Sequence, residues 1–585
     1  AFSLSIISDT KTDEAFKRLS AWLEDCLSNH EDCKTAAANM KPFMPTRVLD
    51  LARATKDKAV LIATAQLPKP APYACLSYCW GSDLDGVVRT VKANLKGHQT
   101  TGIPLSTLPQ TIQDAATVCA KLGIRYVWID SLCIIQDDGE DWAREAMQMC
   151  NVYSHSQLTI AAHQAAACKE GFLGKQIYGQ PDWQREVKTD FGKMIPDANP
   201  KKVFLRLEES RFRSRALDPS PLETRGWTLQ ECILPHRIIH YTAEELIWEC
   251  NTRHFCECGH VEGLTMNGTL PMVRTEIARG KGTDKIKDLA IDGWMHLVQR
   301  YSERNFTFLS DKIAAVAGLA QMVQASIPAT EDSTYLAGLF LRSLPRHLLW
   351  TVESRGGSAY RPATAPDAPA RSVPPRAPTW SWASVDNPVS YPRMLVDHED
   401  REYITVHREG CFATTADGAS SRGAGTMGEL LLEGPVIPVK LITVESPEQH
   451  SSEGSSDSWM SRLILAWTRN GWRAKVVCDV ARDFDVKVDK DGHDCWTCWT
   501  STNWHRCEEC NLKYGPRDTE CIALKVGMYC VPSDRKRLFL VLERSRTVEG
   551  AWERLGVGFA RVDYKNVEAE WELFDQAEVR KVRIV

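Results

Sequence analysis

Residues 108–130 run LPQTIQDAATVCAKLGIRYVWID and hold a helix signal followed at once by a strand signal. Apolar residues recur at helical spacing from Ile112 to Leu122, with Pro109 at a natural helix start and Gly123 at a natural stop. The apolar run at 125–130 then predicts a buried strand. A strand that directly follows a helix is the repeating unit of an α/β sheet.

The neighbouring stretches extend this pattern in both directions. YACLSYC at 73–79 predicts a strand, a helix is expected from about Gly139 to Tyr153, and QLTIAA at 157–162 predicts a third strand. The order β-α-β-α-β predicts parallel strands with right-handed crossovers, that is, a doubly wound sheet. Ligands bind beyond the carboxyl ends of such strands. Those ends are expected at 79–82, 130–133 and 161–163.

The remaining chain differs in character from this α/β stretch. An apolar stripe at helical spacing predicts a helix over 13–28. Residues 225–250 predict a helix followed by a pair of strands, and 284–350 have a helical pattern. Six prolines make 354–378 a linker or long surface loop. Beyond Trp380 the chain becomes β-rich.

Charge and composition exclude several classes of protein. The 585 residues include 71 basic and 76 acidic side chains, and a net charge of -5 gives no electrostatic footprint for nucleic acid. No apolar stretch reaches the ~18 residues that a membrane span needs. The 20 cysteines have no regular spacing and no secretory signal precedes them, so we expect reduced thiols in a cytoplasmic protein.

Four blocks of sequence carry a family resemblance. Between Arg47 and Cys250 the chain resembles the fungal heterokaryon-incompatibility (HET) domain, and WLEDCLSNHEDC and APTWSWASV in the flanks look like full-length family members. The resemblance implies fungal origin and a role in non-self recognition or regulated cell death. Some family members lie beside biosynthetic genes. The blocks are YACLSYCWG, LPQTIQDAATVCAKLGIRYVWIDSLCIIQDD, DWAREAMQMCNVYSHSQLTIAA and RGWTLQE.

The expected organisation combines the resemblance with the composition shifts. It consists of an N-terminal helical segment (1–46), the HET domain (47–262), a helical region (263–353), a Pro-rich linker (354–378), and a β-rich C-terminal region (379–585) with a Cys-rich insertion (478–530).

HET domains also look like remote relatives of Toll/interleukin-1-receptor (TIR) domains, which share a flavodoxin-like parallel sheet. Some TIR domains cleave NAD with a helical glutamate in a Trp-Cys-x-x-Glu setting, and Trp142-Ala143-Arg144-Glu145 is the nearest match here, without the cysteine. Independently, Glu145 falls inside the apolar stripe of its helix, where a carboxylate needs a partner or a raised pKa. It is either a catalytic carboxylate that stabilises an oxocarbenium-like transition state or the partner of an arginine such as Arg225.

Two further candidates for chemistry follow strand ends or begin a helix. Asp130 either faces the ligand crevice or caps the next loop. Arg225 could clamp a phosphate or pair with Glu145 or Asp130. Cys133 would be a nucleophile if His155 or His163 lay beside it, and is otherwise a packing thiol.

Substrate contacts are expected from aromatic and small polar residues near the same edge. Trp80 could stack on a planar ring beside Ser82, or pack in the core, and Trp142 and Cys133 complete the set. The chain has no GxGxxG or GxxxxGK[ST] motif, so neither a Rossmann-type dinucleotide site nor a P-loop is indicated.

A late cysteine cluster has metal-ligand spacing. Cys495-x2-Cys498-x8-Cys507-x2-Cys510 predicts a compact, four-coordinate structural zinc site, with four free thiols as the alternative.

A second cluster, Cys26-x3-His30-x2-Cys33, has a geometric obstacle. On one continuous helix the two thiols would lie ~10.5 Å apart along the axis, too far for one zinc ion. The helix would have to break after Ser28, with a fourth ligand such as Cys256 or Cys258. Packing thiols are the favoured interpretation.

Three hypotheses about function result. The first is a cell-death effector that hydrolyses NAD at the N-glycosidic bond, with Glu145 as its central carboxylate. The second is an enzyme that acts on a small fungal metabolite in the same cleft, through Asp130, Arg225 and nearby tryptophans. The third is a non-catalytic module that binds a protein partner or self-associates through its flanks.

Overall fold

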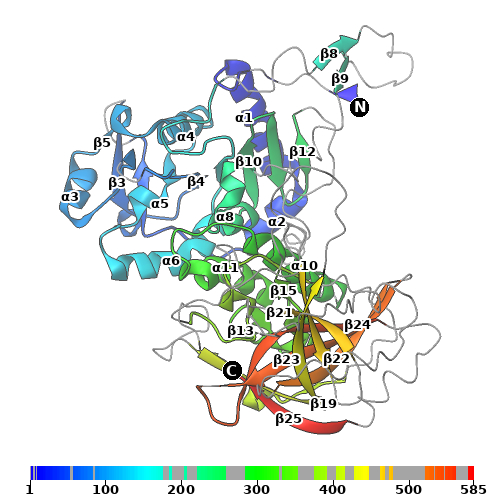
Figure 1. Ribbon diagram of the computed structural model, residues 1–585. Coiled ribbons are helices and arrows are strands. Elements are labelled where there is room, and N and C mark those ends of the chain that lie inside the picture. Colours follow the sequence, from blue (N-terminus) through cyan, green and yellow to red (C-terminus); the bar gives the residue numbers. More distant parts are fainter. Residues whose placement is uncertain are drawn as a thin grey trace. The chain divides into compact units, whose positions relative to one another are not determined.

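The computed structural model divides the described chain into two compact units (Figure 1). The first consists of Ala1–Leu297, Arg304–Thr307 and Ala314–Pro328, and the second of Val298–Glu303, Phe308–Ile313 and Ala329–Val585. The described residues are 2–3, 7, 9–52, 57–83, 86–174, 184–187, 203–206, 220–257, 284–327, 332–352, 375–391, 403–414, 427–446, 461–467, 473–478, 521–531, 534–545, 547–561 and 577–585.

A nine-stranded mixed sheet forms the centre of the first unit, in the order β12-β11-β10-β7-β4-β6-β2-β3-β5. The pairs β6–β4, β4–β7 and β7–β10 are parallel, and the flanking pairs are antiparallel. The strands are β2 (Arg47–Asp50), β3 (Lys58–Ala63), β4 (Tyr73–Ser77), β5 (Ile103–Pro104), β6 (Tyr126–Trp128), β7 (Leu158–Ala162), β10 (Arg237–Tyr241), β11 (Leu246–Cys250) and β12 (His254–Cys256).

The α/β prediction is confirmed, while the sheet is mixed rather than wholly parallel. The three predicted strands are β4, β6 and β7, and the two predicted helices between them are α4 (Gln110–Lys121) and α6 (Gly139–Ser154). The sequence interpretation did not include β2 and β3, which pair antiparallel beside β6. Antiparallel strands need only a short connection, so such a pair can extend an edge without a crossover helix.

The strand order reverses at β4. From β4 it passes through α4 to β6 on one side, then through α6 to β7 on the other. α4 packs with α1 (Asp13–Asn29), and α6 packs with α8 (Thr228–Ile233), so helices cover the sheet on both faces (Figure 1). Ligand crevices form where the strand order reverses, at the carboxyl ends of the strands.

Local signals explain where these helices begin and end. Thr12 caps α1 by accepting a hydrogen bond from the Ala15 N–H, and Asp138 caps α6. α1 ends at Asn29 because His30 is extended, and α2 (Glu31–Asn39) begins directly afterwards. The other helices are α3 (Lys92–Thr100), α5 (Asp130–Cys133), α10 (Asp284–Ser302) and α11 (Asp311–Ser326).

The second unit contains the predicted β-rich region. Its main sheet runs β17-β19-β20-β21-β24-β23-β22, and it closes on itself because β19 also pairs with β22. The strands are β17 (Thr405–Val406), β18 (Phe412–Thr414), β19 (Met427–Ser446), β20 (Ser461–Trp467), β21 (Arg473–Cys478), β22 (Cys521–Val531), β23 (Asp534–Arg544), β24 (Trp552–Arg561) and β25 (Glu578–Ile584).

Short strands complete the description. The remaining strands are β1 (Phe2–Ser3), β8 (Gln184–Val187), β9 (Val203–Arg206), β13 (Tyr335–Leu336), β14 (Leu339–Phe340), β15 (Thr351–Val352) and β16 (Val389–Ser390). Within the described ranges, no helix is both long and apolar enough to span a membrane.

Candidate functional site

Polar side chains gather where β4, β6, β7 and β10 reach their carboxyl ends. Ser77 is the last residue of β4, Asp130 follows β6, His163 follows β7, and His240 lies near the end of β10. α8, which packs over β4 and β7, adds Glu231. We call Ser77, Tyr78, Trp80, Asp130, Arg225 and Glu231 the carboxyl-edge cluster.

Asp130 is the partly exposed carboxylate of this cluster. Its Oδ2 accepts a hydrogen bond from Trp80 Nε1 at 3.0 Å, and its Oδ1 accepts one from the Ser131 N–H at 2.7 Å. Desolvation raises the pKa of Asp130, while the charge of Arg225 and these hydrogen bonds act against the rise. The Trp80 and Ser131 donors therefore orient the Asp130 carboxylate.

Glu231 is the buried carboxylate of the cluster. Ser77 Oγ donates a hydrogen bond to Glu231 Oε2 at 2.6 Å. Burial, followed by the negative charge of Asp130, raises the pKa of Glu231 to about 7. The group therefore changes protonation state near neutral pH, as a general acid or base must.

Arg225 is the cation of the cluster. Its Nη1 donates to the Tyr78 carbonyl oxygen at 2.5 Å, and its charge partly offsets the rise in the pKa values of Asp130 and Glu231. The Arg225 backbone forms a bridge with Asn305, which fixes the start of the segment that leads into α8. The side chain of Arg225 is thus hydrogen-bonded to the backbone after β4, and its charge acts on both carboxylates.

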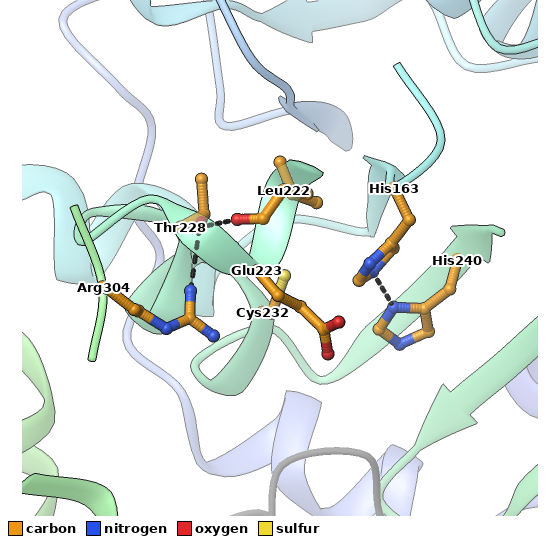
Figure 2. A pocket seen from close by; sticks show the side chains of 7 residues that line it. All are labelled: His163, Leu222, Glu223, Thr228, Cys232, His240 and Arg304. Atoms are coloured by element: carbon orange, nitrogen blue, oxygen red, sulfur yellow. Dashed lines mark hydrogen bonds between the residues drawn. The ribbon is translucent and has the colours of Figure 1, made fainter. Parts of the chain in front are cut away.

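A second group of polar residues adjoins the cluster and lines a small pocket (Figure 2). His163 Nε2 lies 2.9 Å from His240 Nδ1, and His163 Nδ1 lies 2.9 Å from Ser220 Oγ. Although burial raises the pKa of Glu223, the charge of His163 and the hydrogen bond from the Ser220 N–H outweigh it and lower the pKa. The pocket is lined by His163, Leu222, Glu223, Thr228, Cys232, His240 and Arg304.

Residues 73–231 match the family model for the heterokaryon incompatibility protein (HET). These residues form a HET domain. The match begins at the first residue of β4 and ends at Glu231, so it contains the whole carboxyl-edge cluster. No curated protein and no solved structure matches the chain.

Within the HET domain, Glu145 belongs to a different set of contacts. Its side chain is 1% exposed and its Oε1 lies 3.7 Å from both Arg47 Nη2 and Arg144 Nε. Arg47 also pairs with Asp141 at 2.5 Å. The salt-bridge partner of Glu145 is therefore Arg47 and not Arg225, because β2, which begins at Arg47, lies beside β6 and brings this arginine under α6.

Cys133 lies in a thiol environment that disfavours nucleophilic chemistry. It is 1% exposed, its Sγ accepts the Ile129 N–H at 3.5 Å, and burial raises its pKa to about 12. The ring nitrogens of the two histidines considered as its base bind elsewhere: His155 contacts the Asn151 carbonyl, and His163 contacts His240 and Ser220.

The other predicted substrate contacts, Trp80, Ser82 and Trp142, are at least partly exposed, unlike Cys133. Trp80 is partly exposed and precedes Gly81, whose φ of +93° and close approach to Ala167 suit a residue without a Cβ. Ser82 is exposed. Trp142 is 38% exposed and packs edge-on against Trp227, with 6.3 Å between ring centroids.

Sequence reasoning missed Glu231, His163 and His240 as members of one site. Glu231 stands in the apolar run TLQECIL, and its position inside that stripe was the available signal. The four cysteines of the predicted zinc knuckle, Cys495, Cys498, Cys507 and Cys510, lie outside the described residues.

Proposed function

We propose that this protein is a heterokaryon-incompatibility effector whose HET domain hydrolyses the N-glycosidic bond of NAD or a related nucleotide at the carboxyl-edge cluster. The observation that carries the proposal is the pair Asp130 and Glu231. The charge of Arg225 acts on both carboxylates, and burial together with the charge of Asp130 raises the pKa of Glu231 to about 7. Paired carboxylates in unlike environments are the arrangement that glycosidic cleavage uses.

The proposed reaction assigns a role to each side chain. Asp130 stabilises the positive charge that develops on the ribose as the C1′–N bond breaks and its electron pair passes to the nicotinamide nitrogen. A water molecule forms the new C1′–O bond, and ionised Glu231 takes up its proton. Arg225 binds a phosphate of the nucleotide, and Trp80 offers a partly exposed ring for stacking.

The expected likeness of HET domains to TIR domains favours the same reaction. Among the four parallel strands, the order β6-β4-β7-β10 puts β4, the first of the four along the chain, second in the row, and a flavodoxin-like sheet has the same arrangement of its parallel strands. The catalytic glutamate suggested by that resemblance is Glu145. Its pairing with two arginines makes Asp130 the better candidate for the charge-stabilising carboxylate.

The test is release of nicotinamide from NAD by the purified full chain, followed by chromatography. We expect turnover by the wild type and a loss of about 100-fold or more in D130N and in E231Q. E140Q, which changes an exposed acid on α6, serves as the matched control and retains activity. Absence of turnover by the wild type would refute the proposal.

The variant E145Q separates the two candidate carboxylates. Loss of turnover in D130N with activity retained in E145Q supports the carboxyl-edge cluster. The reverse result would assign the chemistry to α6 and overturn the roles proposed for Asp130 and Glu231.

A further inference from the structure

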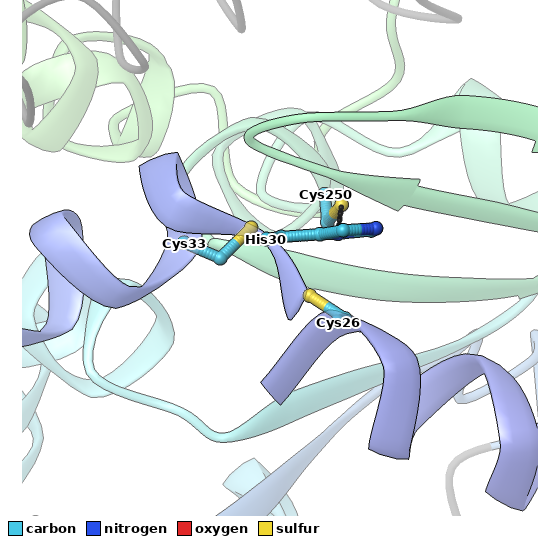
Figure 3. A group of neighbouring side chains, drawn as sticks. All are labelled: Cys26, His30, Cys33 and Cys250. Atoms are coloured by element: carbon cyan, nitrogen blue, oxygen red, sulfur yellow. Dashed lines mark hydrogen bonds between the residues drawn. The ribbon is translucent and has the colours of Figure 1, made fainter. Parts of the chain in front are cut away.

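Four buried metal-ligand side chains converge at the junction of α1, α2 and β11 (Figure 3). Cys26 comes from the last turn of α1, His30 from the break between the helices, Cys33 from α2, and Cys250 from the end of β11. Their ligand atoms all lie within 4.8 Å of one another. His30 and Cys250 are 220 residues apart in the chain, so the tertiary fold brings this group together.

The spacing of these atoms suits a tetrahedral metal ion. With Zn–S bonds of about 2.3 Å, two sulfurs at tetrahedral corners lie about 3.8 Å apart. The His30 Nδ1 atom already lies 3.4 Å from Cys250 Sγ. Contraction by about 1 Å at most would bring all four atoms to coordination distance.

The break in the helix removes the geometric obstacle that the sequence presented. α1 ends at Asn29, and His30 is extended, with φ −89° and ψ 103°. His30 stands at the N-cap of α2 without making a side-chain capping hydrogen bond, so its ring is turned toward the thiols instead. The fourth side chain is Cys250 and not Cys256, while Cys258 lies outside the described residues.

The surroundings of the four side chains match those of a metal centre. Asp25 Oδ2 lies 3.1 Å from His30 Nε2, which favours the proton on that nitrogen and leaves Nδ1 free to ligate. The Arg253 N–H donates to Cys250 Sγ at 3.3 Å, and Arg237 Nε donates to Cys26 Sγ at 3.2 Å. Donors directed at sulfur stabilise thiolate over thiol.

The net charge of a zinc centre at this place would explain why the guanidinium of Arg237 is buried beside it. A divalent ion with three thiolates and one neutral imidazole carries one negative charge. Arg237 is only 6% exposed and contacts Cys26, so it supplies the compensating positive charge. Neutral thiols would offer this buried cation no counter-charge.

We propose that Cys26, His30, Cys33 and Cys250 bind one zinc ion that fastens the N-terminal helices to the sheet of the HET-containing unit. Four protein ligands leave no open position, so the ion is structural. It joins α1 and α2 to β11, next to the packing of Trp22 against Trp248 and Phe255. Because the ion links α1 and α2 to β11, which lies far along the chain, it also restricts the conformations open to the unfolded chain.

The test uses the full chain carrying C498S and C507S, which removes the later CxxC pairs from the zinc count. Isolated without chelators, this reference chain is expected to contain about one zinc per chain. X-ray absorption at the zinc edge is expected to show three sulfurs at about 2.3 Å and one nitrogen at about 2.0 Å. Less than about a tenth of an equivalent of zinc, or a shell of four sulfurs, would overturn the proposal.

Two further variants in the reference chain make the assignment specific. C26S with C250S is expected to lose the zinc, whereas C119S, a buried cysteine on α4, keeps it. If the double variant fails to fold, H30C decides, because it is expected to retain zinc and to change the shell to four sulfurs. Zinc retained by folded C26S/C250S, or an unchanged shell in H30C, would refute the ligand set.

Discussion

The substitution E231Q tests the electrostatics of the carboxyl-edge cluster independently of any substrate. Glu231 is 5% exposed, and its pKa is raised from an ordinary value of 4.5 to about 7 by burial and by Asp130. Each pKa unit corresponds to ~1.4 kcal/mol, so holding this carboxylate ionised in the folded state costs about 3 kcal/mol. A neutral glutamine can still accept the Ser77 hydrogen bond and avoids this cost.

The sign of the effect depends on pH. Between about pH 4.5 and pH 7 the folded protein holds a proton on Glu231 that the unfolded chain releases, so this group contributes less stability as the pH rises. Below that window the wild type and E231Q should be nearly equal in stability. Above about pH 7, E231Q should be more stable by about 3 kcal/mol.

The assay is urea unfolding of both proteins at about pH 5 and at about pH 8.5, followed by circular dichroism and tryptophan fluorescence. The difference between the two proteins isolates Glu231, because other titrating groups are common to both. E140Q, at an exposed position of α6, should show no such change with pH. A constant difference between wild type and E231Q across this range would refute the reasoning.

Two other buried charges give predictions in the same measurement. Lys312 is 1% exposed, and burial lowers its pKa from 10.5 to about 7, so its contribution to stability rises between about pH 7 and pH 10.5. K312M should therefore stabilise the protein by about 5 kcal/mol at most below pH 7 and by little above pH 10. R47M should lower the free energy of unfolding by about 3–5 kcal/mol, because it takes the buried cation away from the carboxylates of Asp141 and Glu145. R144A should lower it by about 1 kcal/mol or less, because the Arg144 side chain is 55% exposed. Equal costs for R47M and R144A, or a K312M effect that does not change with pH, would contradict these assignments.

Periodicity and helix signals were sufficient for the centre of the first unit. Pro109, Gly123 and the apolar spacing between them predicted α4, and the short apolar runs predicted β4, β6 and β7, because each of these signals is local. β2 and β3 gave no comparable signal. Their place beside β6 depends on pairing with residues far along the chain, such as Leu49 with Val127.

The site was predictable only where topology alone brings residues together. Asp130 follows a strand end, so the rule for doubly wound sheets placed it near the ligand crevice, whereas Arg225 was offered only as one of its possible partners. Glu231 joined them only because α8 packs over β4 and β7. Cys250 reached the cysteines of α1 and α2 in the same way, through a tertiary contact that no local spacing records.

The two carboxylate pairs of the HET domain differ in how their charge is balanced, and this difference favours one of them as functional. Asp141 and Glu145 are matched by Arg47 and Arg144, two cations for two anions, and such a group holds elements in place. Asp130 and Glu231 share the charge of Arg225, and their pKa values are raised. An excess of buried negative charge lowers the stability of the folded state. Proteins keep such an arrangement chiefly where a proton or a ligand must be exchanged. A ligand that brings positive charge to this edge of the sheet would remove the imbalance, as the developing ribose cation of a nucleotide does in the proposed reaction.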